Sequence, residues 1–415
     1  MDKEIINKVL GAVSDEEIIS LEQEAVRIPS FTYEEAKLAE YLADYLDNEG
    51  IEVDLLDVED PFGSGRNSKQ PVGIIRGDGS GTSLMFNGHM DHNPLVEGWT
   101  YDPFGGEIVG DYLYGRGSID EKGGVVNLII AGVALKRSGL RLKGDLLLCP
   151  VMGHKSGGIG TQHNLDKGIV SDVIINTESS GSGIASCGVG VVVARVTIHG
   201  KSVHFRTPEP HKSQAINPIA KLNKLISALG PNQRPVPEGG WLSFKADPDL
   251  PGYPQFSLDS ISSEKYPNFD CTLQMQIRLI PGQNASTVHG DLKALLEQLY
   301  AEDPYFRYTL EVPPKGAWNF APYKVSPEEP FVQSLIKAHE YVNGQPPVVG
   351  SEPRLGACGD ANILANAGIP TVQYGPGSGR AHQQWPTADE RIFIPELLAG
   401  ARTMSLAAAE ICGAY

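Results

Sequence analysis

Four metal-ligating side chains stand where short apolar segments of the sequence end or where a glycine-rich segment follows. They are two imidazoles and two carboxylates, from His89, Asp120, Glu178 and His382. Open α/β sheets bind their ligands at the carboxyl ends of the strands, so these side chains could meet at one sheet edge. Imidazole and carboxylate donors suit Zn, Mn or Co. The sequence therefore predicts a site for a divalent transition metal.

Each of these segments also has a simpler interpretation. In Gly88-His89-Met90-Asp91, the imidazole could be a hydrogen-bonded structural group. Alternatively, the Asp91 carboxylate could orient the His89 ring as a hydrogen-bond partner, as carboxylates do for histidines that bind metals. The glycine-rich segment around Asp120 could be no more than a capped turn. The combination of ligand types, rather than any one segment, favours the metal site.

The elements that must position these residues alternate between strands and helices. Helical patterns occupy residues 15–50, 124–137 and 395–411, and strand-like runs occupy residues 51–56, 73–76, 83–87, 145–150, 172–176 and 369–374. Such alternation predicts an α/β fold with a mainly parallel sheet sandwiched by helices.

The pattern changes near Gly188. Residues 188–324 follow the order β-α-β-α-β around a long Pro/Gly-rich stretch at 231–256, which predicts an inserted α+β domain. The first domain is then built from residues 1–187 and 325–415. A chain of 415 residues also exceeds what one hydrophobic core usually serves.

Composition excludes several classes of protein. The chain has 34 basic and 51 acidic residues, a formal net charge of −17 and no Lys/Arg-rich run, which argues against nucleic acid as a partner. Its 5 cysteines show no CxxC spacing, and no apolar run approaches the roughly 20 residues that a membrane span needs. We therefore expect a cytoplasmic protein that acts on a small molecule and binds no membrane.

The run from Gly88 to Gly124 resembles the signature of the metal-dependent hydrolases that include aminoacylase, acetylornithine deacetylase, succinyl-diaminopimelate desuccinylase and glutamate carboxypeptidase. Gly157-Gly158-Ile159-Gly160-Thr161, the segment from Gly200 to His204 and the His382 loop extend the resemblance over nearly the whole chain. The resemblance implies a metallopeptidase-like catalytic domain with two metals. It also implies an inserted lid domain, which commonly joins the subunits of a homodimer or a larger homo-oligomer.

The resemblance further implies a role for each ligand-type residue. His89 and Glu178 would bind one metal, His382 would bind the other, and Asp120 would bridge the two. Asp91 would orient His89.

Two residues of the predicted lid domain also receive roles from the resemblance. His204 would reach the site of a neighbouring subunit and polarise the substrate carbonyl. Arg278 would hold a substrate carboxylate through a bidentate pair, although a surface charge at a strand end explains it as well.

The chain departs from this family at two adjacent positions. Where the family has two glutamates, a general base and a metal ligand, this chain has His154 and Lys155. An ammonium near a dication is repelled by about 4 kcal/mol per unit of charge product at 4 Å and an effective dielectric of 20. Lys155 therefore either replaces one metal or turns away and leaves a weak second site. In both cases we expect about one labile divalent ion per chain.

His154 keeps the capacity of the first glutamate to accept a proton. An imidazole has an ordinary pKa near 6.5, which suits general-base catalysis, although a structural histidine would fit the position too. The essential base of the predicted enzyme is then an imidazole rather than a carboxylate.

These residues predict a hydrolase that cleaves a C–N bond in a small, carboxylate-bearing substrate. Because the altered centre suits an activated electrophile, it favours hydrolytic deamination of an aromatic amine such as 5-nitroanthranilate to the hydroxy acid, a reaction that the resembled family includes. A conventional N-acyl amino acid amidohydrolase, deacetylase or carboxypeptidase is the alternative. A non-catalytic binding protein on the same fold is a third possibility, which the retained set of ligand-type residues disfavours.

Overall fold

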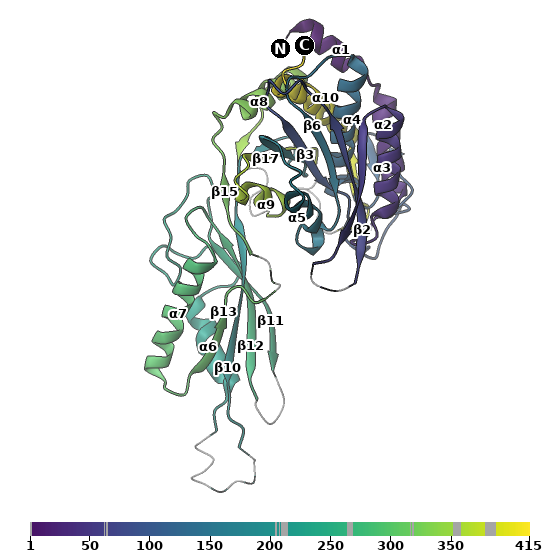
Figure 1. The fold of residues 1–415 in the computed structure, drawn as a ribbon. Coiled ribbons are helices and arrows are strands. Elements are labelled where there is room, and N and C mark those ends of the chain that lie inside the picture. The colour runs from purple at the N-terminus through teal and green to yellow at the C-terminus, as the bar shows by residue number, and fades with distance from the viewer. Residues whose placement is uncertain are drawn as a thin grey trace. The chain divides into compact units, whose positions relative to one another are not determined.

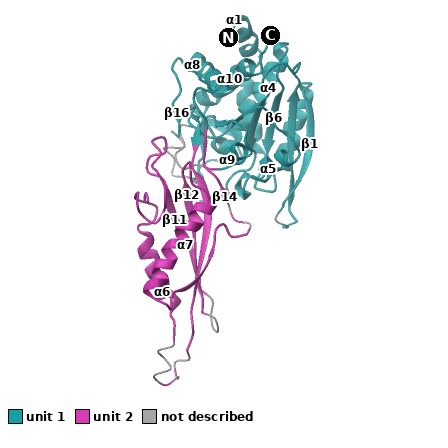
Figure 2. Ribbon diagram, turned by 60° about the vertical axis from the view of Figure 1, so that its left-hand side comes forward, with its two compact units in different colours: residues 1–187, 325–354, 359–415 teal, residues 188–324, 355–358 magenta. Residues whose placement is uncertain are grey.

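The computed structural model describes residues 2–61, 63, 65–203, 206, 208, 215–263, 269–315, 317, 319–351, 358–377 and 387–415. The chain divides into two compact units. Unit 1 comprises Met1–Cys187, Val325–Arg354 and Gly359–Tyr415, and unit 2 comprises Gly188–Lys324 and Leu355–Cys358 (Figure 2).

Unit 1 is built on an eight-stranded sheet with the order β1-β2-β6-β3-β7-β17-β8-β16. The central strands pair in parallel, β3 with β6 and β7, and β7 with β17, whereas β1 and β2 form an antiparallel edge. The strands are β1 (Glu52–Glu59), β2 (Asn67–Ile75), β3 (Leu84–His89), β6 (Leu146–Val151), β7 (Val173–Asn176), β8 (Ile184–Ala185), β16 (Val349–Gly350) and β17 (Thr371–Gln373).

Helices cover both faces of this sheet. They are α1 (Lys3–Leu10), α2 (Asp15–Arg27), α3 (Ala36–Asn48), α4 (Gly123–Ser138), α5 (Ile159–Asp166), α8 (Pro330–Asn343), α9 (Asp360–Asn366) and α10 (Ile394–Ile411). Figure 1 shows α4 and α10 side by side against one face, with α5 and α9 at the other. The mainly parallel sheet between helices confirms the predicted fold class.

Side chains alternate along the strands between the two helical layers. Leu84 and Phe86 of β3 belong to the core formed with α2, α3, α4 and α10, whereas Met85 packs in a second core that contains Leu364 of α9. Helix α4 is buried on nearly all sides because it lies between the sheet and α10. Consequently β3 is buried along its whole length, and it ends at His89.

A smaller sheet completes unit 1. A three-stranded sheet contains β4 (Glu107–Val109), β5 (Tyr112–Tyr114) and β18 (Arg391–Phe393), and it brings the C-terminal region beside the segment that carries Asp120. Short helical turns of this unit occupy Ser118–Lys122 and His154–Ser156. The short strands β9 (Cys187–Gly188) and β15 (Tyr323–Lys324) lie at two points where the chain passes from one unit to the other.

Unit 2 is an α+β unit with an antiparallel sheet in the order β11-β12-β10-β13, on which β14 pairs with β10. Its strands are β10 (Gly190–His199), β11 (Gln255–Ser263), β12 (Cys271–Leu279), β13 (Arg307–Glu311) and β14 (Asn319–Phe320), and its helices are α6 (Pro218–Leu229) and α7 (Ala285–Glu302). Alternate residues of β12 are buried against these helices. The predicted order β-α-β-α-β lacked β11, which follows directly on the Pro/Gly-rich stretch.

None of the helices within the described ranges is both long and apolar enough to cross a membrane.

Candidate active site

Three ligand-type side chains meet at the carboxyl edge of the central strands. His89 ends β3, and Glu178 follows the neighbouring parallel strand β7. The Nε2 atom of His89 lies 3.2 Å from Oδ1 of Asp120 and 3.9 Å from Oε2 of Glu178. All three side chains are buried. The structure thus brings together three of the four predicted metal ligands, whereas His382 lies outside the described residues.

Hydrogen bonding turns the Nε2 atom of His89 toward these carboxylates. Its Nδ1 lies 2.8 Å from the backbone carbonyl oxygen of Asp91. Burial, together with electrostatic interactions with His154 and Lys155, lowers the pKa of His89 to about 4. A neutral imidazole that donates Nδ1–H to this carbonyl presents its Nε2 lone pair to the site, as a metal ligand must.

The Asp91 carboxylate has a different set of partners from the expected one. It accepts hydrogen bonds from the backbone N–H groups of His154 at 3.1 Å and Lys155 at 3.0 Å, and from Oγ1 of Thr32 at 2.9 Å. Its Oδ1 atom lies 3.5 Å from Nδ1 of His89, farther than the carbonyl oxygen of the same residue. The carboxylate therefore holds the turn at residues 154–155, while the backbone carbonyl of Asp91 orients His89.

Lys155 points into the site rather than away from it. Its Nζ atom donates to both carboxylate oxygens of Asp120, at 3.2 Å and 3.1 Å. The Asp120 side chain is 1 % exposed and that of Lys155 is 23 % exposed. An ammonium therefore occupies one side of the carboxylate that bridges two metals in the resembled family.

His154 stacks on His89, with ring centroids 4.1 Å apart and ring planes 11° from parallel. Ligand atoms of His89, His154 and Glu178 all lie within 4.8 Å of one another, so these residues form a group that could hold a metal ion. Because the two ring planes are nearly parallel, their in-plane lone pairs cannot both point at one metal ion. The geometry therefore suits His89 as the ligand and His154 as a neighbouring base.

A buried carboxylate that the sequence analysis missed contacts His154. Oδ2 of Asp360, the first residue of α9, lies 3.0 Å from Nδ1 of His154. Burial alone would raise the pKa of Asp360, but the electrostatic interaction and hydrogen bond with His154 hold this pKa below its usual value. The only sequence signal was an acidic residue at the start of a helical segment, which is common in proteins.

A second overlooked carboxylate, Glu390, holds the segment that carries Asp120. It accepts backbone N–H groups from Gly117 at 2.9 Å and from Ile119 and Asp120 at 3.2 Å each. Nη1 of Arg116 lies 2.9 Å from the same carboxylate, and both side chains are fully buried. Burial raises the pKa of Glu390 to about 7 despite these donors.

The predicted substrate-binding residues belong to unit 2. His204 lies outside the described residues. Arg278 lies on β12, where its Nη1 donates to Sγ of Cys358 at 2.7 Å. Its guanidinium therefore already has a polar partner within unit 2.

The described donors fit a divalent transition metal. One imidazole and two carboxylates, with a second imidazole beside them, are the donors that Zn, Mn and Co prefer. The ammonium of Lys155, a cation without a lone pair, lies against the carboxylate that a second ion would need.

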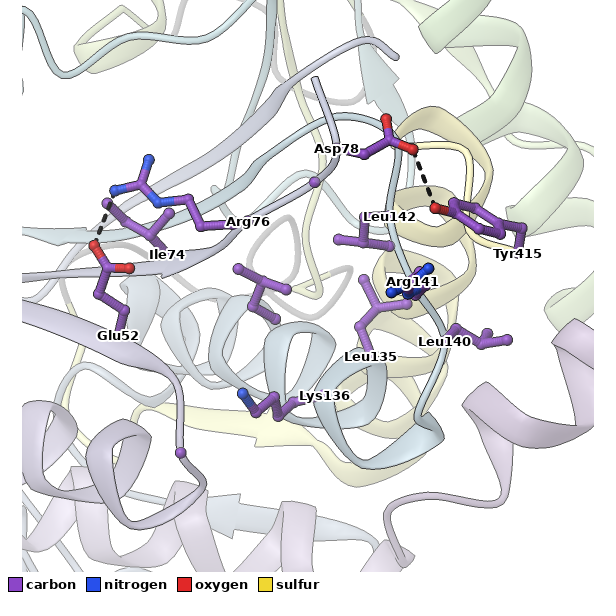
Figure 3. A pocket seen from close by; sticks show the side chains of 13 residues that line it. Glu52, Ile74, Arg76, Asp78, Leu135, Lys136, Leu140, Arg141, Leu142 and Tyr415 are labelled. Atoms are coloured by element: carbon purple, nitrogen blue, oxygen red, sulfur yellow. Dashed lines mark hydrogen bonds and ion pairs between the residues drawn. The ribbon is translucent and has the colours of Figure 1, made fainter. Parts of the chain in front are cut away.

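A surface cavity of about 640 Å³ lies at the opposite end of α4 from this site (Figure 3). Two pairs of its polar side chains are hydrogen-bonded, Arg76 with Glu52 at 2.9 Å and Tyr415 with Asp78 at 3.0 Å. It is lined by none of the ligand-type residues described above, so it is not part of the candidate active site.

The chain is similar to known proteins in sequence and in fold. Residues 85–410 match peptidase family M20/M25/M40. The chain is 26 % identical to N-formyl-4-amino-5-aminomethyl-2-methylpyrimidine deformylase of Halalkalibacterium halodurans, over 96 % of each chain. It is 28 % identical to succinyl-diaminopimelate desuccinylase of Methylorubrum extorquens, over 93 % of this chain and 96 % of the relative. Among solved structures, aminopeptidase PepT of Bacillus cereus shares the fold with a TM-score of 0.74 and 19 % identity, over 96 % of this chain and 100 % of that one.

Proposed function

Because the chain belongs to peptidase family M20/M25/M40, a family of metal-dependent hydrolases of C–N bonds, we propose that it hydrolyses the amide bond of a small N-acyl compound with a single divalent metal. The observation that carries the proposal is the contact of the Lys155 ammonium with both oxygens of Asp120. We propose that this ammonium takes the place of the second ion of a two-metal centre.

The relatives favour the conventional alternative over deamination of an aromatic amine. Their names describe removal of a formyl group and of a succinyl group, each from a nitrogen atom. Both reactions release a carboxylic acid and an amine. The comparisons give no support to the 5-nitroanthranilate branch, so an N-acylated primary amine is the substrate class that we propose.

The ligand set and the metal have separable tasks in this reaction. His89, Glu178 and Asp120 would hold the ion at the buried strand edge. A bound Zn, Mn or Co ion would supply Lewis-acid chemistry, polarising the acyl carbonyl and making water more acidic. The loss of water from this buried edge on substrate binding would strengthen each charge interaction in it.

His154 is the proposed base. Its Nε2 would accept a proton from the attacking water while the water oxygen forms a bond to the acyl carbon. The same proton would pass to the leaving nitrogen as the C–N bond breaks, so that a carboxylate and an amine are released. General acid–base catalysis of this kind contributes about 10²- to 10⁴-fold in rate.

Lys155 would supply the positive charge that the second metal supplies in a two-metal centre. Its ammonium neutralises Asp120 in the substrate-free protein and would favour negative charge developing on the acyl oxygen. One cation of charge +1 replaces a dication here, so we expect a slower enzyme on unactivated amides than a two-metal relative.

Unit 2 would contribute to substrate binding and to assembly. We propose that Arg278 exchanges its contact with Cys358 for a substrate carboxylate, and that the protein forms a homodimer or larger homo-oligomer in which His204 acts on a neighbouring site. His382 would complete the metal site or the substrate pocket. A cytoplasmic location is consistent with the 5 cysteines, all of which are free thiols.

The substrate class can be tested by incubating the Zn- or Mn-loaded protein with N-formyl and N-succinyl derivatives of the same diamine, and with 5-nitroanthranilate. We expect release of formate or succinate together with an equal amount of amine, and no ammonia. Ammonia release from the aromatic amine, without acyl hydrolysis, would replace this proposal with the deamination hypothesis. Tight binding of all compounds without turnover would instead favour a binding protein.

A further inference from the structure

A buried carboxylate, Asp360, lies next to the proposed base. Asp360 is 2 % exposed, and its Oδ2 lies 3.0 Å from Nδ1 of His154. The two residues are 206 positions apart in the chain, so this contact depends on the tertiary fold rather than on local sequence. We infer that Asp360 is a positioning residue that fixes the tautomer and the ring orientation of His154. This inference rests on the proposed base role of His154.

The hydrogen bond decides which nitrogen can accept a proton. A buried carboxylate is an acceptor, so it selects the tautomer in which Nδ1 of His154 carries the hydrogen. The Nε2 atom, which points away from Asp360, then keeps its lone pair. Without this partner, a neutral imidazole would be free to place its hydrogen on Nε2 and would lose its function as a base.

The neighbouring residue allows the ring to approach this carboxylate. A Cβ atom placed on Gly359 would lie 2.5 Å from Cε1 of His154, closer than any real contact. Glycine therefore leaves the space that the imidazole occupies between Asp360 and His89. Any side chain at this position would have to displace the ring.

His89 is also held by a hydrogen bond at Nδ1, but its acceptor is a backbone carbonyl. Its Nδ1 lies 2.8 Å from the Asp91 carbonyl oxygen, so both stacked rings bind an oxygen through Nδ1. His89 uses a backbone acceptor, which substitution cannot remove. His154 depends on a side chain, and this difference makes the role of Asp360 testable.

Asp360→Asn is the main test, because the amide can donate to Nδ1 and so favour the opposite tautomer. In Ser-His-Asp hydrolases, the equivalent change lowers kcat by about 10⁴-fold for this reason. We expect a fall of at least about 10²-fold in kcat, with KM and metal content within threefold of the wild-type values. Asp166→Asn, on the exposed end of α5, is the matched control and should leave all three quantities unchanged.

The tautomer itself can be measured in the metal-free protein by ¹⁵N NMR of labelled histidine, with His154 assigned from a His154→Asn variant. Wild type should show a protonated Nδ1, and Asp360→Asn should show a protonated Nε2. Gly359→Ala provides a second variant that retains every charge but displaces the ring, and it should also lower kcat.

Two outcomes separate the failure of this inference from the failure of the proposed function. If Asp360→Asn keeps the wild-type tautomer and a kcat within threefold, Asp360 does not position His154. If His154→Asn keeps a normal kcat, His154 is not the base. The contact of Asp360 with His154 then has no role in catalysis, whichever tautomer is observed.

Discussion

Lys155→Met removes the ammonium from Asp120 while keeping much of the volume of the side chain. The pair lies 3.1 Å apart and is largely shielded from solvent. A unit charge and a dication that share one carboxylate repel each other by about 8 kcal/mol at 4 Å and an effective dielectric of 20, before screening. A tenfold change in Kd corresponds to about 1.4 kcal/mol, which is a small part of this repulsion.

We therefore expect Lys155→Met to bind Zn or Mn at least tenfold more tightly than the wild type. The same variant should hydrolyse N-acyl substrates at least tenfold more slowly, because the positive charge next to the acyl oxygen is gone. Tighter metal binding combined with slower turnover is an unusual pair of effects, and simple damage to the site would weaken both.

Metal affinity can be measured by competition with a chromophoric chelator, and turnover by release of the acyl acid. Lys167→Met removes an exposed lysine at the end of α5 and serves as the control. Unchanged or weaker metal binding in Lys155→Met would refute the reasoning, because the ammonium would then not compete with the ion for Asp120.

Two further substitutions test the groups that hold the site together. Burial and the charge of Asp91 raise the pKa of Glu35 from 4.5 to about 7. The folded protein therefore holds this proton more tightly than the unfolded chain does, and stability declines as pH rises from about 4.5 to 7. Glu35→Gln has no carboxyl group that could ionise. Chemical denaturation should therefore show a free energy of unfolding up to about 3 kcal/mol larger than that of the wild type at pH 8, and equal to it at pH 4. An equal increase in stability at pH 8 and at pH 4 would show that ionisation of Glu35 is not the cause. Glu390→Ala leaves Arg116 buried without this carboxylate. The variant should lose about 3–5 kcal/mol of stability and bind metal more weakly, measured by denaturation and chelator competition. A variant of wild-type stability would show that the Arg116–Glu390 pair is dispensable.

Much of the fold could be predicted from local sequence patterns. The apolar runs that became β3, β6 and β7 are short, continuous and buried, as parallel strands between helices must be. Their ends predicted where His89 and Glu178 meet. The two-residue strands β8 and β16 could not be predicted, because so few residues show no periodicity.

Asp360 and Glu390, which support the site, could not be predicted for a different reason. Asp360 meets His154 across 206 positions, and Glu390 meets Asp120 across 270. A single sequence contains no signal that pairs residues so far apart. Spacing also could not decide whether His89 contacts the carboxylate or the carbonyl of Asp91, since both lie within reach of a residue two positions away. The direction of Lys155 depended likewise on the tertiary structure, which turns it into the site.

Metal stoichiometry tests the proposed single-ion centre most directly. The purified protein would be incubated with excess Zn or Mn, freed of loose ions by gel filtration, analysed for metal per chain, and crystallised for an anomalous difference map. We expect about one ion per chain, bound beside His89 and Glu178, with Nζ of Lys155 still on Asp120. Two tightly bound ions on either side of Asp120, with Lys155 turned away, would contradict the proposal that its ammonium takes the place of the second metal.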